Sequence, residues 1–181
     1  MARNSKVGWT HHTYNFWRGC QKVSAGCAAC YAEQLVVHGR IAEDVWGSNK
    51  PRTMAAESTR KQPYAWDRKA KKNGVRERVF AFSLGDVFEA FDGVIQDHTG
   101  TQMYSCLGCG GYVRGNVRCD CGNSITDPAT MEDLRIDFWK VIHETPKLDW
   151  LLLTKRPENI FNMFVNNAGP AQPLNDADSH V

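Results

Sequence analysis

The sequence contains no hydrophobic run that is long enough to cross a membrane. Its longest stretch of large apolar residues, at 150–153, has only the length of a β-strand, whereas a membrane-spanning helix needs about 18 apolar residues. The first residues, MARNSKVGWTHHTYNF, contain no apolar segment of the signal-peptide type. We therefore expect a soluble, cytoplasmic protein without a membrane partner.

The net charge is also small, at +2, but it is unevenly distributed. Residues 50–78 contain ten Lys and Arg residues against only three acidic residues, so the rest of the chain is net acidic. A basic segment of this kind can follow the phosphates of a nucleic acid. It is equally typical of a solvated helix face, and the sequence leaves both interpretations open.

The sequence lacks the features of a disulfide-bonded secreted protein, although it contains seven cysteines. Their number is odd, and six of the seven fall in C-x2-C or C-x-C pairs. Close pairs in a reducing compartment are more often metal ligands than disulfide partners. The cysteines therefore predict metal binding.

Apolar runs alternate with amphipathic segments along most of the chain. Strands are predicted over 78–83 and 149–154, and helices over 27–39, 63–72, 129–145 and 158–167. Asp127 and Pro128 supply an N-cap and a first-turn proline for the third of these helices. Residues 44–62 are interpreted as a loop with a helical turn.

Continuous apolar strands that alternate with helices predict an α/β fold with parallel strands. Chemistry on such sheets lies at the carboxyl ends of the strands. The residues expected there are Cys20, Ser83, Asp86, Thr154, Lys155 and Arg156. Alternative roles are a helix cap for Asp86 and an exposed surface pair for Lys155 and Arg156.

Residues 99–126 interrupt this pattern with a segment that is rich in glycine and cysteine and poor in core-forming side chains. We interpret it as an inserted module. The chain then divides into a first part at 1–98, the insert at 99–126, a continuation at 127–167 and a disordered tail at 168–181.

The insert carries its four cysteines as Cys106-x2-Cys109-x9-Cys119-x-Cys121. Two cysteine pairs at glycine-rich turns are typical of a zinc ribbon, in which four thiolates close a tetrahedral site. Such a site also folds a segment that has too little core of its own. A redox-active dithiol is the alternative, and Arg114, Arg118, Tyr104 and Tyr112 are candidates to bind nucleic acid.

The other three cysteines are spaced as Cys20-x6-Cys27-x2-Cys30. Three thiolates without a fourth nearby suit a four-iron cluster with one open iron, because a structural zinc site closes with four ligands. A zinc site completed by His11, His12 or His38 and a set of free thiols are the alternatives. Trp17 is a candidate to shield such a cluster from water.

Three segments carry a resemblance to a known family. They are WTHHTYNFWRGCQKVSAGCAACYAEQL at 9–35, FSLGDVFE at 82–89 and LLLTKRPENI at 151–160. In this order they resemble a phage-associated family known as the "gp thirty-seven/gp sixty-eight" family, which has a GC-x6-C-x2-CYAE motif and a later strand ending in LTKRPE. That family in turn resembles radical S-adenosylmethionine (SAM) enzymes.

The resemblance implies a partial (β/α) barrel of the radical-SAM type, interrupted by the zinc-ribbon-like insert. A [4Fe–4S] cluster on Cys20, Cys27 and Cys30 would bind S-adenosylmethionine. Ser83 and Asp86 would hold amino or ribose groups of that cofactor. Lys155 and Arg156, next to Thr154, would take a carboxylate or a substrate phosphate.

The implied reaction starts from a 5′-deoxyadenosyl radical and modifies or repairs a nucleic acid or nucleotide, with a reductant supplying the electron. A phage-encoded protein would act in the cytoplasm of the host cell. Family members continue beyond the LTKRPE segment, so the resemblance also implies a truncated chain or a second chain that completes the barrel. Two other functions fit the sequence: a non-catalytic, zinc-stabilised nucleic-acid-binding protein and an inactive truncated family member.

Overall fold

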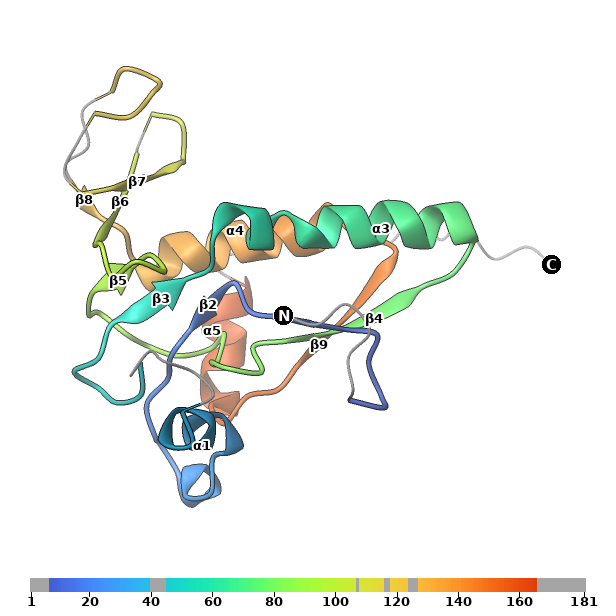
Figure 1. Ribbon diagram of the computed structural model, residues 1–181, viewed down its shortest axis with the longest axis horizontal. Helices are drawn as coiled ribbons and strands as arrows, with labels where there is room; N and C mark the ends of the chain where they lie inside the picture. The colour runs from blue at the N-terminus through green and yellow to red at the C-terminus, as the bar shows by residue number, and fades with distance from the viewer. Residues whose placement is uncertain (1–6, 40–44, 107, 116–117, 124–126, 166–181) are drawn as a thin grey trace.

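The computed structural model describes residues 7–39, 45–106, 108–115, 118–123 and 127–165. At its centre three parallel strands form a sheet in the order β1 (His12–Tyr14), β4 (Glu77–Ala81) and β9 (Leu148–Leu152) (Figure 1). Neighbouring strands of the sheet are not consecutive in sequence, because helices lie in the connections between them. The predicted α/β class with parallel strands is confirmed.

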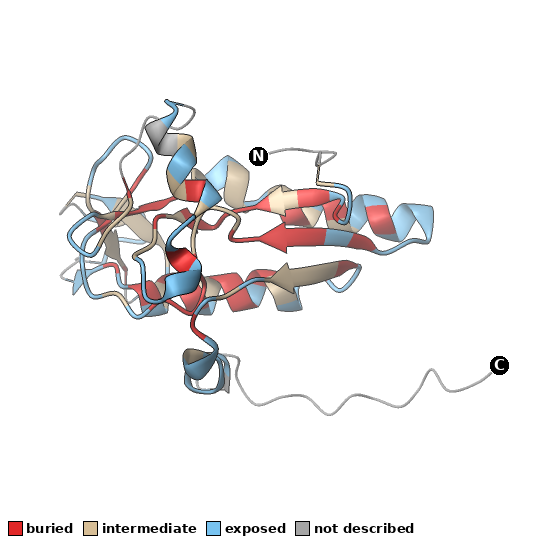
Figure 2. Cartoon of the chain, turned by 90° about the horizontal axis from the view of Figure 1, so that it is seen from below, coloured by how far each residue is buried: buried red, intermediate tan, exposed pale blue. Residues whose placement is uncertain are grey.

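Helices α3 (Gln62–Asn73) and α4 (Met131–His143) cover one face of this sheet (Figure 1). Aromatic side chains fill the space between sheet and helices, with the ring of Tyr14 close to those of Trp66, Phe138 and Trp150. Figure 2 shows the buried residues concentrated in the strands and on the helix faces that meet them. A sheet and two helices thus enclose one apolar core.

The helix ends follow from their capping residues, and one prediction about them was wrong. α3 begins beside Pro63 and ends at Gly74, which has a φ of 66° and closes the helix in the left-handed region. α4 begins at a capping box, in which Thr130 and Asp133 bond to each other's backbone N–H groups. Asp127 and Pro128, which were predicted to begin this helix, instead form β8.

The strands are shorter than predicted at their carboxyl ends. β4 stops at Ala81 because Phe82 adopts a φ of 56°, the one positive value among the described residues other than glycine. β9 likewise stops at Leu152. β1 was not predicted at all, since three residues that include a histidine carry no clear strand pattern.

A second small sheet lies beside the first, in the order β2 (Trp17–Arg18), β3 (Arg52–Met54) and β5 (Ile95–Gln96). It occupies part of the predicted loop at 44–62, which also contains α2 (Glu57–Arg60). Isolated bridges continue it from Gly19 to Gly85 and from Cys20 to Trp46. These bridges bring the first cysteine to the ends of the central strands.

The insert forms a third sheet, which is antiparallel and has the order β7 (Tyr112–Arg114), β6 (Met103–Ser105) and β8 (Asp127–Pro128). Met103 packs into the main core, so the insert is anchored through β6. The predicted limits of 99 and 126 therefore leave out β8, which pairs with the insert. Figure 1 shows the insert extending away from the central sheet.

Two short helices complete the described chain, α1 (Tyr31–Val37) and α5 (Ile160–Val165). The central sheet is open, and the residues that the structure describes do not close a barrel. None of the helices among these residues is both long and apolar enough to cross a bilayer. The predicted disordered tail at 168–181 lies outside the described residues.

Candidate metal sites

Cys20 lies just beyond β2, where backbone contacts fix the chain. The N–H of Gly19 donates to the carbonyl of Leu84, and the N–H of Gly47 donates to the carbonyl of Cys20, both at 2.9 Å. Gly19 has a φ of 110°, and a Cβ there would lie 2.7 Å from the carbonyl oxygen of Val45. The residue before this cysteine must therefore be glycine.

Cys27 and Cys30 come from the turn and the helix that follow Cys20. Cys27 ends a 3₁₀ turn, and Cys30 immediately precedes α1 and accepts a bond of 3.2 Å from the N–H of Gln34. The helix thus begins at Tyr31, four residues after Cys27 and later than predicted, and it ends at Val37, two residues before the expected stop at Gly39. Cys30 stands at the amino end of the helix.

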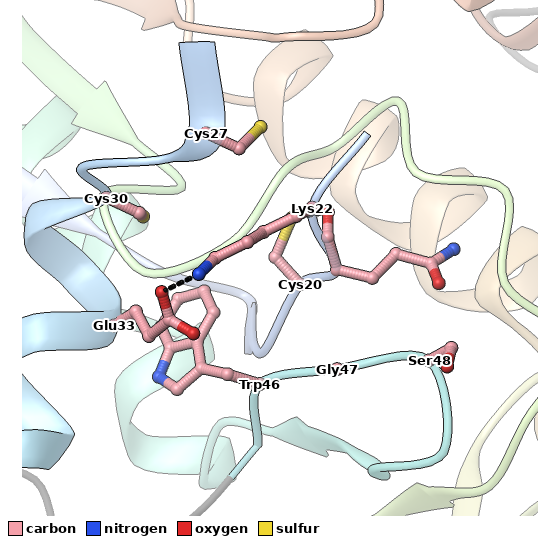
Figure 3. A pocket seen from close by; sticks show the side chains of 9 residues that line it. Cys20, Lys22, Cys27, Cys30, Glu33, Trp46, Gly47 and Ser48 are labelled. Carbon is pink, nitrogen blue, oxygen red and sulfur yellow. Dashed lines mark hydrogen bonds and ion pairs between the residues drawn. The ribbon is translucent and has the colours of Figure 1, made fainter. Parts of the chain in front are cut away.

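Two cavities, each of about 240 Å³, meet at the three cysteines. Both cavities are lined by Cys20, Cys27, Cys30 and Trp46. An ion pair between Lys22 and Glu33, with 2.7 Å between the ammonium and the carboxylate, crosses the first cavity (Figure 3). The second cavity extends to the strand ends, where its lining includes Phe80, Phe82, Ser83, Asp86, Leu153, Lys155 and Arg156.

The structure therefore brings together the residues that the sequence placed at the carboxyl ends of the strands. Thr154, which does not line the cavity, donates its hydroxyl to the Asp86 carboxylate at 2.8 Å. Tyr31 joins α1 to the same edge, because its hydroxyl donates to the carbonyl of Ser83 at 2.6 Å. The loop with the cysteines and the ends of β4 and β9 thus form one continuous site.

Arg156 links these segments at the inner wall of the second cavity. Its side chain is only 3% exposed, and its guanidinium donates to Cys20 Sγ at 3.3 Å, to Asp86 at 2.8 Å and to the carbonyl of Gln21 at 2.7 Å. A weaker bond of 3.4 Å reaches Glu89. Arg156 is therefore neither the exposed surface residue nor the phosphate ligand that the sequence suggested, because acceptors of this chain engage it.

Like Arg156, Asp86 forms its hydrogen bonds with other residues of this chain. Its carboxylate accepts bonds from the Thr154 hydroxyl, from the N–H of Lys155 at 3.1 Å and from Arg156. No helix begins directly after Asp86, where the next element is the strand β5, so Asp86 is not a helix cap. It ties the end of β4 to the end of β9, and its oxygens are largely occupied by these bonds.

A second buried ion pair supports the site, and the sequence did not reveal it. Arg52 and Glu89 are both fully buried and form two bonds, of 2.7 and 2.9 Å. Glu89 also accepts the N–H of Gln21 at 2.9 Å. Arg52 had been counted with the basic segment, and no sequence periodicity distinguishes it from the exposed cations there.

The surroundings shift the pKa values of Cys20 and Cys27 in opposite directions. Burial and the neighbouring Glu89 carboxylate raise the pKa of Cys20 to about 11, while the Arg156 guanidinium opposes this rise. Backbone N–H groups of Val23 and Ser24 lower the pKa of Cys27. Metal uptake at this site would therefore release a proton from Cys20.

Ser83 and Lys155 differ in how available they are to a ligand. The hydroxyl of Ser83 accepts a bond of 3.0 Å from the Asn15 amide, which also accepts the N–H of Leu84. Lys155 is exposed at the edge of the second cavity, and its ammonium lies near Gly26 of the cysteine loop. Of the predicted cations, Lys155 is the one placed to meet an anionic group.

The histidines and Trp17 do not take the positions that the alternatives required. His11 and His12 lie at the amino end of the sheet, where His12 pairs with Glu77 at 2.6 Å. Trp17 is fully buried against Phe82 and lines neither cavity, whereas Trp46 lines both. Trp46 is thus the aromatic residue beside the cysteines, and its surroundings in the sequence gave no signal for this role.

The insert holds the second group of cysteines. Sγ of Cys106 lies 3.6 Å from that of Cys121, and Sγ of Cys109 lies 3.4 Å from that of Cys119. All four sulfurs lie within 4.8 Å of one another. Zn–S bonds of about 2.3 Å in a tetrahedron place sulfurs roughly 3.8 Å apart, so this group can hold a metal ion such as zinc.

Two glycine turns shape this group. The N–H of Gly110 donates to the carbonyl of Cys106 and that of Gly122 to the carbonyl of Cys119, both at 2.8 Å. Both glycines have positive φ values, 69° and 86°. The N–H of Cys109 lowers the pKa of Cys106 to about 7, so one thiol is already disposed to ionise.

Cys20, Cys27 and Cys30 are spaced differently from the insert cysteines. Among the His, Cys, Asp and Glu side chains that the structure describes, only the insert group brings three or more ligand atoms within 4.8 Å of one another. The first site therefore does not surround a single small ion. A zinc site completed by a histidine does not fit this geometry.

Ion pairs reduce the charge available on the predicted basic segment. Lys61, Lys69 and Arg76 lie within salt-bridge distance of Glu57, Glu77 and Asp149. The exposed cations at the end of α3 and the start of β4 lie at the amino edge of the sheet, opposite the cysteine loop. A nucleic acid on these residues would not reach the candidate site from that edge.

Residues 4–107 match the profile of a family that is described as a protein of unknown function (DUF5131). The matched segment includes Cys20, Cys27, Cys30, Ser83 and Asp86, and it ends within the insert. No curated protein and no solved structure matches the chain significantly.

Proposed function

The chain belongs to the DUF5131 family of proteins of unknown function, and we propose that it is an iron–sulfur protein of the radical-SAM type. Its [4Fe–4S] cluster would be held by Cys20, Cys27 and Cys30, and S-adenosylmethionine would lie in the cavity at the strand ends. The observation that carries the proposal is that three cysteines from one loop separate two cavities at the carboxyl edge of a parallel sheet.

The residues at this site fit such a cluster better than they fit zinc. The donors are three soft thiolates, and they are too widely spaced to surround one ion. Thiolates of a cubane cluster bind different irons and so stand further apart than thiolates on one zinc. The other four cysteines belong to the insert, which leaves one iron without a protein thiolate.

A cluster held by these three cysteines would supply one electron for the cleavage of S-adenosylmethionine to methionine and a 5′-deoxyadenosyl radical, the species that would take a hydrogen atom from the substrate. The chain's own residues would bind and orient S-adenosylmethionine and the substrate. Phe80, Phe82 and Leu153 give the second cavity apolar walls that exclude water. Lys155 at its edge offers a cation to a carboxylate or phosphate, and Ser83 offers its hydroxyl.

The proposal includes three partners. A reductant must supply the electron, and a nucleic acid or nucleotide is the proposed substrate class. A further chain segment or a second chain is proposed to complete the partial barrel, since β9 is an edge strand among the described residues. Leu153, just beyond β9, is 60% exposed and would be covered by such an addition.

Incubation with S-adenosylmethionine and dithionite tests this function. After anaerobic reconstitution with iron and sulfide, we expect the chain to release 5′-deoxyadenosine, measured by chromatography. Cys30→Ala should abolish the release, because it removes a cluster ligand. Cys109→Ser, which changes the other cysteine group, is the matched control and should retain it. An iron-loaded protein that releases no more 5′-deoxyadenosine than Cys30→Ala would exclude this reaction.

The alternative, a zinc-stabilised nucleic-acid-binding protein, is less well supported. The insert can hold zinc, and Arg60 and Lys61 of the basic segment line one pocket together with Cys109. Lys61 is paired with Glu57, however, and the exposed cations at the end of α3 and the start of β4 lie at the other edge of the sheet. We therefore keep nucleic acid as a proposed substrate and not as the basis of the function.

A further inference from the structure

Arg156 makes an unusual contact for a buried arginine. Its guanidinium donates to Cys20 Sγ at 3.3 Å while the side chain is 3% exposed. The same nitrogen also donates to the Asp86 carboxylate at 2.8 Å, and the other terminal nitrogen donates to the carbonyl of Gln21. Arginine delivers several N–H groups in one fixed plane, so these bonds hold its orientation toward the sulfur.

The surroundings of Arg156 keep it in place independently of any bound group. Asp86 is fixed by Thr154 and by the N–H of Lys155, and Glu89 is fixed by Arg52. The side chains of Asp86, Glu89 and Arg52 are at most 5% exposed. The N–H···S bond is therefore preorganised and does not depend on a flexible surface side chain.

We propose that Arg156 is the positioning residue that holds Cys20 toward the cluster and raises the cluster's reduction potential. The inference rests on the proposed function, because it needs an iron–sulfur cluster on Cys20. It goes beyond that function in assigning a role to a residue that is not a metal ligand and whose guanidinium is engaged by acceptors of this chain.

The physical reason is the charge that reduction adds. An added electron makes the cluster and its thiolates more negative, and N–H donors to the sulfur together with a nearby positive charge stabilise that state. Burial strengthens this effect, because solvent does not screen the charges. Asp86 and Glu89 offset part of the positive charge of Arg156, but neither donates to the sulfur.

The test compares the midpoint potentials of reconstituted wild-type, Arg156→Gln and Arg156→Lys proteins, followed by electron paramagnetic resonance. Arg156→Gln should lower the ratio of reduced to oxidised cluster about tenfold at a fixed potential, equivalent to about 59 mV for a one-electron couple. Arg156→Lys keeps the charge without the planar donor group, and we expect a smaller shift in the same direction.

Lys61→Gln is the matched control. It removes a positive charge that is 69% exposed at its side chain, pairs with Glu57 and lines neither cavity at the cysteines. We expect its potential to equal that of the wild type, because solvent screens an exposed charge. Circular dichroism confirms that each variant is folded.

The outcomes separate the two proposals. A wild-type protein that binds no iron overturns the proposed function and this inference with it. A wild-type cluster whose potential is unchanged in both Arg156 variants overturns the inference alone. Iron that is lost from folded Arg156→Gln, yet retained in Arg156→Lys and Lys61→Gln, supports the positioning role.

Discussion

Glu89 is the residue on which the buried charges beneath the site converge. It accepts two bonds from Arg52, one from the backbone of Gln21 and a longer one from Arg156. Two arginines and a backbone N–H therefore share a single carboxylate that has no exposed surface. A buried pair of this kind adds little net stability while intact, but losing one partner leaves an uncompensated charge.

Replacing this carboxylate should therefore destabilise the fold strongly. We expect Glu89→Ala to lower the free energy of unfolding by about 3–5 kcal/mol, because Arg52 would remain buried without its partner. Urea unfolding followed by tryptophan fluorescence measures the effect. Glu57→Ala is the control, since the Glu57–Lys61 pair is exposed and should leave the midpoint unchanged. Equal midpoints for Glu89→Ala and Glu57→Ala would show that the buried network does not hold the fold.

At the scale of single residues, the sequence predicted the residues of the candidate site better than the buried ion pair that supports them. Cys20 and the strand-end residues Ser83, Asp86 and Lys155 were predicted at the carboxyl ends of the strands, and the structure places them at that edge. Arg52 and Glu89 were missed as a pair because 37 positions separate them. A pairing between distant segments depends on tertiary structure, and a local pattern does not contain it.

Among the helices, α4 has the most complete cap. The Thr130 hydroxyl accepts the N–H of Asp133 at 3.2 Å, and the Asp133 carboxylate accepts the N–H of Thr130 at 2.9 Å. The helix packs Leu134 and Phe138, both fully buried, into the centre of the core. Its start therefore influences the packing of the whole sheet.

Removing this cap should lower stability by a moderate amount. We expect Thr130→Ala to reduce the free energy of unfolding by about 1 kcal/mol, which thermal unfolding would detect as a lower melting temperature. Thr130→Ser keeps the hydroxyl and should behave almost as the wild type. The sequence prediction had placed the helix start at Asp127, so a larger loss in Asp127→Ala than in Thr130→Ala would contradict the cap described here.

The elements themselves were predicted unevenly. The helix at Gln62–Asn73 and the two apolar strands were found because their patterns are long and their ends carry proline, glycine or polar residues. β1 and β3 were missed, since each has three residues and includes a buried polar or charged side chain. Such strands are defined by their neighbours in the sheet, and their own composition does not indicate them.

For the whole molecule, the two cysteine groups lie in different structural units. The insert group is held by an antiparallel sheet that joins the main core through Met103, whereas the first group lies in the loop at the carboxyl edge of the central sheet. The structure describes an open three-stranded sheet, and the barrel expected from the family resemblance stays a proposal. A barrel needs further strands after β9. The sequence after β9 contains no strand pattern, so it predicts none of them.

Metal and sulfide analysis after anaerobic purification tests the central claim most directly. We predict about four irons and one zinc per chain. Because the two groups are separate, Cys27→Ala should lose the iron and keep the zinc, and Cys109→Ser should lose the zinc and keep the iron. A protein that contains two zincs and no iron, or that keeps its iron in Cys27→Ala, would contradict the assignment of an iron–sulfur cluster to Cys20, Cys27 and Cys30.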